Sequence, residues 1–329
     1  MNRQQALLAW TQEVLQDSDC YVKSASSDAS FRSYWRVFSH GQTYIVMDAP
    51  PEHENCLPFI DISEKLDKSG VLVPVVIAQD LQQGFLLLSD LGTVQYLNVL
   101  NTDNFNKLYG NACNALHTIQ QKTSQESIPH YDETLLQQEL DLFSQWFVYK
   151  HLDLSLNNNQ LEIIKTTNQL LINNALQQPQ TFVHRDYHSR NLMKVKSNNP
   201  GILDFQDAVI GPATYDLVSL LKDCYIQWDS TRVNQVSDQF REKYNTLNNT
   251  TIGSEQWQKW FDLMGVQRHL KVVGIFCRLN YRDNKPDYLK DLNLTLCYIK
   301  QTCSKYPELM PLLDLIKEIS PSMETICEQ

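Results

Sequence analysis

Two hydrophobic patterns divide the chain near residue 93. Before it, short runs rich in apolar and β-branched residues predict strands, separated by turn residues such as those at 40–42. The strands are expected at 21–22, 34–38, 43–47, 71–78 and 84–88. Apolar residues at helical spacing predict two helices in the same part, at 3–16 and 56–69, and Gly70 ends the second. This part therefore predicts a small antiparallel sheet with flanking helices.

Helical spacing prevails after residue 93. Helices are expected at 104–121, 132–150, 160–177, 214–223, 231–247, 255–281, 287–304 and 308–318. The polar segments 122–130 and 247–254 predict surface loops. Strands followed by helices indicate an α+β fold, with a small antiparallel β N-terminal lobe (residues 1–92) and a larger, mostly helical C-terminal lobe (residues 93–329).

Composition narrows the class of protein. The 329 residues carry a net charge of −10, which argues against a nucleic acid or an anionic membrane surface as the main partner. The eight cysteines form no C-x-x-C pair, and we expect buried, reduced thiols in a cytoplasmic protein. Gln and Glu interrupt the apolar run of the first helix, so the pattern does not predict a signal peptide. The apolar stretch 71–78 is too short to span a membrane.

Residues 182–207, FVHRDYHSRNLMKVKSNNPGILDFQD, carry the candidate chemistry. An apolar entry, a polar loop, and two short strands around a turn predict a hairpin with acidic groups at its mouth. Asn191 follows Asp186 by five residues, and Asp204 follows Asn191 by thirteen. This pattern suits phosphoryl transfer, in which one carboxylate takes the proton of an attacking hydroxyl. An amide oxygen and a second carboxylate then hold Mg²⁺ on the nucleotide phosphates.

Two simpler interpretations of the same segment exist. Loops are often polar without a function, and His184 and His188, four residues apart, have the spacing of a zinc pair on a helix. No further His or Cys follows at ligand spacing, and the segment has loop character. The position of Leu203-Asp204-Phe205 after the loop favours a kinase-like site instead.

These motifs resemble those of the aminoglycoside phosphotransferase family, relatives of the protein kinases. The catalytic and metal-binding loops of that family match His184-Arg185-Asp186, Asn191 and Asp204. Longer stretches of the sequence are similar to those of the bacterial cell-wall sugar kinases that act on N-acetylmuramate and N-acetylglucosamine. The matching stretches are HRDYHSRNLM, LDFQDAVIGPATYDLVSLLKDCYI, SDASFRSYWRV, VMDAPPE, GFLLLSDLG and FDLMGVQRHLKVVGIFCRLNYRD, and they span nearly the whole chain.

The resemblance implies a protein-kinase-like fold with ATP and Mg²⁺ as cofactors. Asp186 is then the catalytic base, and Asn191 and Asp204 are the metal ligands. Residues 24–30 take the place of the loop over the phosphates, although a solvated turn would look the same. Residues 89–92 take the place of the hinge that pairs with adenine. The nucleotide-binding residues implied in this way are Ser30, Arg32, Ser89 and Leu91.

One departure from the wider family concerns the cation that binds the nucleotide phosphates. Such kinases carry a Lys on the third strand, whereas this strand ends Ile45-Val46-Met47-Asp48. The charge is expected from Arg32, Arg36 or Lys23, and the sequence does not choose among them. The helix acid that normally pairs with this Lys has two candidates, Asp61 and Glu64.

The sugar pocket is expected among residues near the catalytic loop. Candidates for substrate contacts are Asp48, His188, Arg190 and Asp207, together with the aromatic faces of Tyr187 and Tyr215. Asp207 either contacts substrate or supports the site. Asp216 is expected to be structural, bonding the backbone of the catalytic loop. A basic stripe on one helix face (Arg268, Lys271, Arg278, Arg282) meets the lactyl carboxylate of N-acetylmuramate or the nucleotide phosphates, or else is a solvated face paired with nearby acids.

The leading hypothesis is an ATP-dependent kinase that phosphorylates the anomeric hydroxyl of these N-acetyl sugars, in peptidoglycan recycling. Its reaction type follows from Asp186, Asn191 and Asp204, and its substrate from the resemblance. A kinase of the same fold for an aminoglycoside, choline or another sugar is one alternative. A non-catalytic nucleotide-binding pseudokinase is another: the missing strand Lys favours it, and the intact Asp186 disfavours it.

Overall fold

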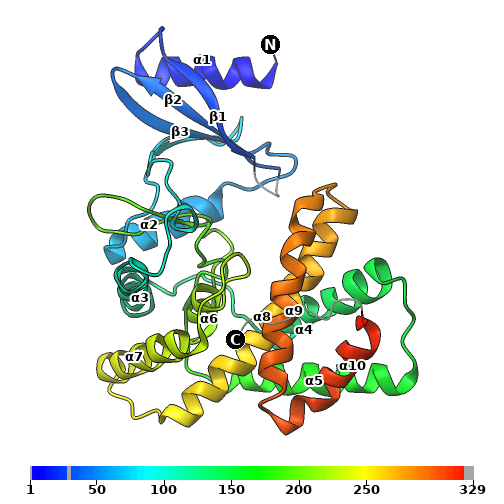
Figure 1. Cartoon of the computed structure of the whole chain (residues 1–329). Helices are drawn as coiled ribbons and strands as arrows, with labels where there is room; N and C mark the ends of the chain where they lie inside the picture. Colours follow the sequence, from blue (N-terminus) through cyan, green and yellow to red (C-terminus); the bar gives the residue numbers. More distant parts are fainter. Residues whose placement is uncertain (1, 28–30, 322–329) are drawn as a thin grey trace. The chain divides into compact units, whose positions relative to one another are not determined.

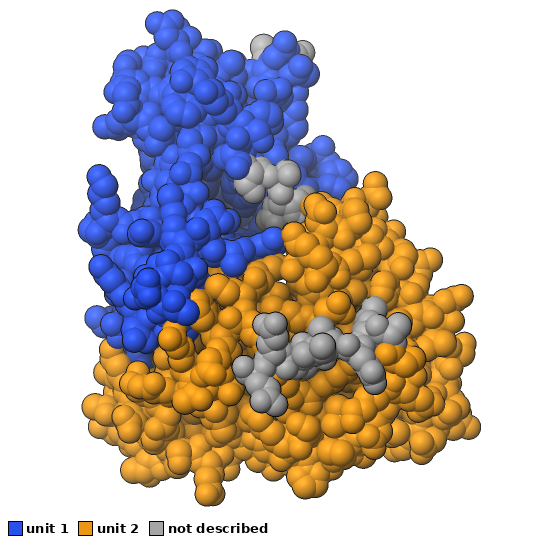
Figure 2. Space-filling model, in the orientation of Figure 1, with its two compact units in different colours: residues 1–124, 190–207 blue, residues 125–189, 208–329 orange. Residues whose placement is uncertain are grey.

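The computed structural model describes residues 2–27 and 31–321 and divides into two compact units (Figure 2). Unit 1 comprises residues 1–124 and 190–207, and unit 2 comprises residues 125–189 and 208–329. Unit 1 thus contains the predicted N-terminal lobe, a following helical segment and the predicted hairpin. The proposed lobe boundary at residue 92 remains a prediction.

A five-stranded antiparallel sheet forms the framework of unit 1. Its strand order is β1-β2-β3-β5-β4, with bounds Tyr21–Ser27, Ser33–Ser39, Gln42–Asp48, Phe85–Ser89 and Val76–Asp80. Helix α1 (Arg3–Leu15) lies against this sheet (Figure 1). Buried Leu7 of α1 packs in one cluster with Val37, Val46 and Leu87 of the strands. One face of the sheet therefore lies on an apolar core.

The predicted strand at 71–78 is wrong in its first half. Regular pairing begins only at Val76 and continues to Asp80. Pro74 explains the delay, because proline has no backbone N–H to donate to the next strand. Leu72 instead forms an isolated bridge with Gly201.

The rest of unit 1 joins the hairpin to the first 124 residues. It contains α2 (Leu57–Ser69), the short 3-10 helix η1 (Tyr96–Asn98), α3 (Phe105–Lys122), β7 (Leu192–Met193) and β8 (Gly201–Ile202). Strands β7 and β8 pair with each other as the sequence predicts. The backbone of Lys194 donates to Val94 at 2.7 Å, and that of Ile202 donates to Leu72 at 2.8 Å. These bonds fix the hairpin beside two segments of the chain, one before β4 and one after β5.

Unit 2 is mostly helical. Its helices are α4 (Glu133–Leu142), η2 (Phe143–His151), α5 (Asn158–Leu176), α6 (Tyr215–Leu221), α7 (Ser230–Asn248), α8 (Ser254–Tyr281), η3 (Pro286–Asp291), α9 (Leu292–Cys303), η4 (Pro307–Leu309) and α10 (Met310–Ile319). Strands β6 (Gln180–Val183) and β9 (Val209–Pro212) pair antiparallel. Within the described part of the chain, no helix combines the length and the apolar character needed to cross a membrane.

Helix α8 is the centre of unit 2. It packs against α4, α5, α6, α7 and α9 (Figure 1). Most of its residues are buried, including polar ones such as Asp262, Arg268 and Lys271. A helix surrounded on all sides must satisfy its polar groups inside the protein, which places ion pairs in the interior of this unit.

The predicted helix at 132–150 is not one regular helix. Helix α4 ends at Leu142, and the chain continues as the π-helix η2. Gly274 of α8 lies opposite this change: a Cβ there would stand 2.4 Å from the backbone carbon and oxygen of Leu142. Periodicity did not reveal the change, because it depends on the approach of α8.

Candidate active site

Unit 1 contains a pocket of about 400 Å³. Apolar side chains from the sheet and α2, such as Ile45, Leu88 and Phe59, form part of its wall. The segment from Ser89 to Gly92 lines it, as do Arg190, Asn191 and Asp204 of the hairpin segment. An apolar wall with a few polar groups is typical of a pocket for a small ligand.

The segment after β5 is held in a fixed shape. Asp90 accepts a hydrogen bond from Arg36 Nε at 2.7 Å and one from the backbone N–H of Gly92 at 2.8 Å. Burial would raise the pKa of Asp90, but these hydrogen bonds from Arg36 and Gly92 hold it below its ordinary value. A second nitrogen of Arg36 donates to the carbonyl of Gly92 at 2.8 Å. Ser89 and Leu91 therefore line the pocket on a segment of fixed conformation, and Arg36 stabilises the conformation of this segment.

Asn191 and Asp204 meet at the wall of the same pocket. Asn191 Nδ2 donates to Asp204 Oδ2 at 3.2 Å, and Gln206 donates to Asp204 Oδ1 at 2.8 Å. The backbone N–H of Leu203 donates to the carbonyl of Asn191 at 2.9 Å, which ties the two segments together. Asp204 has a φ of 64°, a left-handed conformation that costs a non-glycine residue free energy and is frequent at functional sites. A carboxylate beside an amide oxygen is a donor set that fits Mg²⁺.

Arg32 forms an ion pair that the sequence did not predict. One of its terminal nitrogens lies 2.9 Å from Glu54 Oε2, and their side chains are only 10% and 14% exposed. Although burial works against the charge, the neighbouring Tyr34, Glu54, Asp207 and Asp204 raise the pKa of Arg32. This buried, charged guanidinium therefore lies within electrostatic reach of Asp204.

The two acids named from the sequence have other partners. Asp61 pairs with Lys65 and Glu64 with Lys68, each one turn further along the surface of α2. Glu54 precedes α2, outside the helical pattern that suggested the other two. Only the folding of residues 31–54 brings it to Arg32.

Asp186 belongs to unit 2, on the loop that follows β6. Asp216 of α6 accepts the backbone N–H groups of His184 at 2.7 Å and Arg185 at 3.0 Å. This confirms its predicted structural role. Arg185 has a φ of 75°, so the two bonds stabilise a backbone shape that the residue alone would disfavour.

The other end of the loop is held in a similar way. Asp223, just after α6, accepts from the backbone N–H of Ser189 at 2.9 Å and from its hydroxyl. Helix α6 and the turn after it thus hold both sides of Asp186. The chain passes into unit 1 directly after Ser189.

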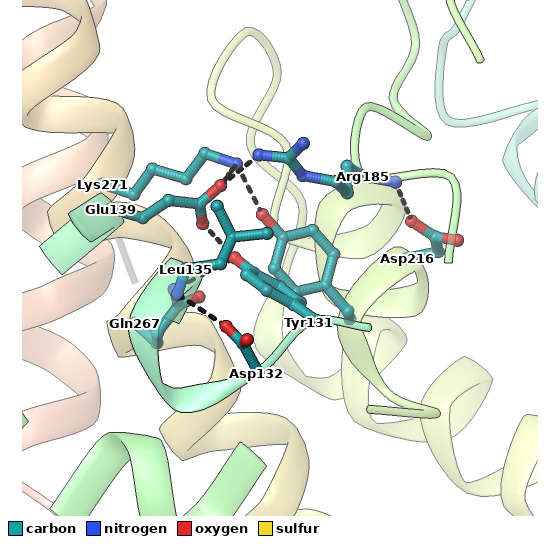
Figure 3. Close-up of polar contacts among 9 residues, drawn as sticks. Tyr131, Asp132, Leu135, Glu139, Arg185, Asp216, Gln267 and Lys271 are labelled. Atoms are coloured by element: carbon teal, nitrogen blue, oxygen red, sulfur yellow. Dashed lines mark hydrogen bonds and ion pairs between the residues drawn. The ribbon is translucent and has the colours of Figure 1, made fainter. Parts of the chain in front are cut away.

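A buried cluster of charges holds the side chain of Arg185 (Figure 3). Glu139 of α4 accepts hydrogen bonds from Arg185 and from Tyr131, and Lys271 Nζ of α8 lies 2.9 Å from Glu139 Oε1. Lys271 also donates to the hydroxyl of Tyr215 at 3.0 Å. One carboxylate therefore faces two cations. Glu139 carries no signal in the sequence, because it lies in an ordinary helical pattern 46 residues before Arg185.

These cations keep Asp186 ionised. Burial would raise its pKa, but the positive charges of Lys271, His188, Arg268 and Arg185 outweigh burial and hold the pKa below its ordinary value. Asp216 shows the opposite balance: burial, with a contribution from the charge of Asp186, raises its pKa to about 7. The ionised Asp186 suits a group that accepts a hydrogen bond and then a proton.

The remaining candidates lie in different surroundings. Arg190 lines the pocket of unit 1, and exposed Asp207 lies within electrostatic reach of Arg32. Asp48, at the end of β3, pairs with Arg3 of α1 at 2.6 Å. His188 packs edge-on against Tyr225, with ring centroids 5.4 Å apart. Ser30 lies outside the described residues.

The basic stripe is not simply a solvated helix face. Arg268 and Lys271 are buried, Arg278 is half-buried, and Arg282 is exposed and paired with Asp283 at 2.8 Å. The alternative of a surface stripe is therefore wrong for the first two of these residues. Helical spacing placed them on one face correctly, but α8 is covered by its neighbours.

The sequence model of the phosphotransferase enzyme family matches residues 22–251. An N-acetylmuramate/N-acetylglucosamine kinase of Pseudomonas putida is 44% identical over 299 residues, covering 91% of this chain and 88% of the relative. A kinase of the same name from Neisseria meningitidis is 37% identical over 325 residues, covering 97% and 96%.

Solved structures share the fold at low identity. The ADP-bound aminoglycoside phosphotransferase APH(2'')-Ib has a TM-score of 0.59 at 14% identity, covering 90% of this chain and 98% of its own. A choline/ethanolamine kinase family protein from Mesorhizobium loti has a TM-score of 0.61 at 11% identity, covering 96% and 100%. The expected fold, with a small antiparallel sheet and a larger helical part, is confirmed.

Proposed function

The chain belongs to the phosphotransferase enzyme family, and we propose that it is an ATP-dependent kinase for the anomeric hydroxyl of N-acetylmuramate and N-acetylglucosamine. The named relatives, 37–44% identical over most of the chain, support these sugars. The observation that carries the reaction type is the contact between Asn191 and Asp204 at the wall of the pocket. Such a pair, with a separate ionised carboxylate, is what phosphoryl transfer from a nucleotide requires.

Asp186 accepts the proton of the anomeric hydroxyl as its oxygen forms a bond to the γ-phosphorus of ATP. The bond between that phosphorus and the β–γ bridging oxygen breaks, and ADP leaves. Asp186 suits this role because Lys271, His188, Arg268 and Arg185 keep it ionised. Its main contribution is to orient the hydroxyl, since phosphoryl transfer depends chiefly on positioning and charge stabilisation.

The nucleotide is assigned to residues of unit 1. Ser89 and Leu91 receive the adenine on the rigid segment after β5, and Ser30 and Arg32 serve the phosphates. Asn191 and Asp204 hold Mg²⁺, which neutralises the charge of the phosphate oxygens. Arg32, paired with Glu54, is the best placed of the three cations left open by the sequence. Arg36 is bound to Asp90, and Lys23 lies over the rings of Tyr21 and Phe38.

On the substrate side, we assign sugar contacts to His188, Arg190, Asp207 and Asp48. Asp48 is the least favoured of them, because Arg3 already pairs with it. The product would be a sugar 1-phosphate formed in the cytoplasm, for peptidoglycan recycling. Cys113 and Cys277 are buried and free, as expected, but the expectation of reduced thiols is wrong for Cys297, which is disulfide-bonded. The net charge of −10 disfavours a nucleic acid as partner.

The test is phosphate transfer from Mg·ATP to a panel: N-acetylmuramate, N-acetylglucosamine, glucose, choline and kanamycin. The expected result is ADP release with the two N-acetyl sugars only, and products that have lost their reducing ends. Transfer to choline or kanamycin instead would keep the reaction type and overturn the substrate.

Asp186→Asn tests the base in the same assay. General-base catalysis is worth about 10²- to 10⁴-fold, so kcat should fall by that amount. Nucleotide affinity, measured by calorimetry, should stay near that of the unmodified protein, because the nucleotide is assigned to other residues. A nucleotide-binding pseudokinase would show binding but no turnover even before the substitution, and near-full turnover of the variant would refute the role of Asp186.

A further inference from the structure

Four cations follow one another along one face of α8 and its C-cap residue, Arg282, and two of them form ion pairs. Lys271 pairs with Glu139, and Arg282 pairs with Asp283. Arg268 is 4% exposed and lies within electrostatic reach of Asp186 and Asp223. Arg268 is buried beside acidic side chains of the protein, so we infer that it stabilises the loop that carries Asp186 and does not bind an incoming anion.

Arg268 and Arg278 differ from Lys271 and Arg282. Among the residues that the structure describes, neither forms an ion pair, and the Nε of each is buried without a hydrogen-bond partner. Arg268 donates to Cys224 Sγ at 3.7 Å, whereas no described residue accepts a hydrogen bond from the side chain of Arg278. Burial and the like charge of Arg282 lower the pKa of Arg278. A half-buried cation without a paired acid costs folding free energy, which suggests that its partner comes from outside the chain.

The acids nearest to Arg278 are engaged elsewhere. Glu139 and Asp283 both act on its charge. However, Glu139 accepts from Arg185, Lys271 and Tyr131, and Asp283 accepts from Arg282 Nε at 2.8 Å and from a second nitrogen at 2.9 Å. Arg278 therefore remains in a locally positive region of a chain whose net charge is −10.

The position of Arg278 relates it to the catalytic loop within unit 2. It follows Lys271 by seven residues, which is two helical turns or about 10 Å along α8, on the same face. Glu139, the partner of Lys271, acts electrostatically on the guanidinium of Arg278, which relates Arg278 to the same cluster. Through Glu139, Lys271 is joined to Arg185, the neighbour of Asp186 (Figure 3).

The two sugars named for the relatives differ in one group. N-acetylmuramate carries a lactic acid in ether linkage on O3, and N-acetylglucosamine has a free hydroxyl there. The lactyl group is carried on C3, two ring bonds from the anomeric carbon C1, so its carboxylate is set apart from the anomeric hydroxyl. Arg278 is a cation on the same unit as Asp186, at a distance from it. Its charge and its position therefore suit it to bind this carboxylate.

We propose that Arg278 binds the lactyl carboxylate of N-acetylmuramate and so determines how strongly this sugar is preferred over N-acetylglucosamine. The proposal rests on the proposed function, because it presumes that both sugars are substrates. It concerns the ratio of their kcat/KM values and leaves the transfer itself to Asp186. A charge-assisted hydrogen bond to a carboxylate is worth about ten- to hundredfold in that ratio.

The experiment compares Arg278→Met and Arg278→Lys with Lys259→Met, a control cation of the same helix that pairs with Glu308. Arg278→Met should lower kcat/KM for N-acetylmuramate by about ten- to hundredfold relative to N-acetylglucosamine, and Arg278→Lys should recover part of the loss. Lys259→Met should leave the ratio unchanged. An equal fall for both sugars, or no change in the ratio, overturns the proposal.

If the variants fold poorly, a modified substrate still tests the proposal with the unmodified protein. The methyl ester of N-acetylmuramate has the lactyl group without its charge. The unmodified protein should use the acid better than the ester, whereas Arg278→Met should use both equally. Equal use of acid and ester by the unmodified protein refutes the carboxylate contact. Turnover of neither sugar by the unmodified protein refutes the proposed function instead, so the two failures are distinguishable.

Discussion

At the scale of single residues, the polar groups around the reaction are arranged in pairs of acid and cation. Asp204 lies near Arg32, Asp90 is bound by Arg36, and Glu139 faces both Arg185 and Lys271. Each buried charge would be costly alone, and each becomes tolerable through its partner. Arg278 stands out against this background, because it has neither an ion pair nor a side-chain hydrogen bond among the described residues.

Arg32→Met should weaken ATP and ADP binding by about tenfold or more, because a charge-assisted hydrogen bond is worth about 1.5–3 kcal/mol. Adenosine, which has no phosphate, should bind as well as before, and calorimetry measures all three. Lys23→Met is the matched control, since the ammonium of Lys23 lies 5.4 Å from the ring centroid of Phe38. Equal losses for adenosine and ATP would mean that Arg32 only supports the fold.

At the scale of elements, α6 is the support of the catalytic loop. Its residue Asp216 bonds the backbone of His184 and Arg185, and Asp223 after its end bonds Ser189. Helix α8 then supplies the cations that face Asp186. The loop therefore owes its shape to two helices that follow it in sequence.

Asp216 should make stability depend on pH. Its pKa is about 7 in the folded protein, against an ordinary value of 3.8, so between these values the folded state holds a proton that the unfolded state has lost. Stability from this group is greatest at low pH and falls by about 1.4 kcal/mol per pH unit across that window. Asp216→Asn should remove this slope, as measured by urea unfolding at pH 5 and pH 6. Parallel pH profiles for the two proteins would contradict the raised pKa.

Gly274 should be the least replaceable glycine of α8. A Cβ at this position would stand 2.4 Å from the backbone of Leu142, so Gly274→Ala should destabilise the protein by about 2 kcal/mol or more. Gly265→Ala is the control on the same helix, because its Cβ would lie 3.5 Å from Lys222 at ordinary contact distance. It should be neutral or stabilising by up to about 1 kcal/mol. Urea unfolding of both variants measures the difference, and similar values would refute the close approach.

At the scale of the whole molecule, local charge and net charge have opposite signs. The chain carries −10, yet four cationic side chains act on Asp186 in unit 2. In unit 1, Asn191 donates to Asp204 at the wall of the pocket, and their carbonyl and carboxylate oxygens are of the kind that binds a cation. Overall composition therefore excludes some partners but does not describe the surroundings of either group.

Metal and nucleotide should stabilise the protein together. At a concentration of Mg·ATP one hundred times its Kd, the unfolding free energy should rise by about 2.7 kcal/mol, which raises Tm by several degrees. ATP with EDTA, or Mg·ATP with Asp204→Asn, should give a smaller shift in a thermal scan. Asp103→Asn, which changes an exposed acid, is the control and should behave as the unmodified protein does. A full shift with Asp204→Asn would remove that residue from the metal site.

The amino-acid sequence by itself determined the elements and the local motif. Strands and helices follow from the period of apolar residues, and the positions of Asp186, Asn191 and Asp204 follow from a short segment that folds back on itself. These features depend on neighbours in the chain, so a pattern reveals them. The change to a π-helix at Phe143 and the late start of β4 are exceptions, and the first depends on contact with α8.

The tertiary structure decided which charges meet. Glu54 reaches Arg32, Glu139 reaches Arg185 across 46 positions, and Asp223 reaches Ser189 across 34. It also buried two of the four cations that helical spacing placed on one face of α8. Ion pairs between distant segments leave no periodic trace in the sequence, because their geometry arises only when helices pack. For the same reason, Arg278 became a candidate for substrate recognition only once its neighbours were seen to be paired.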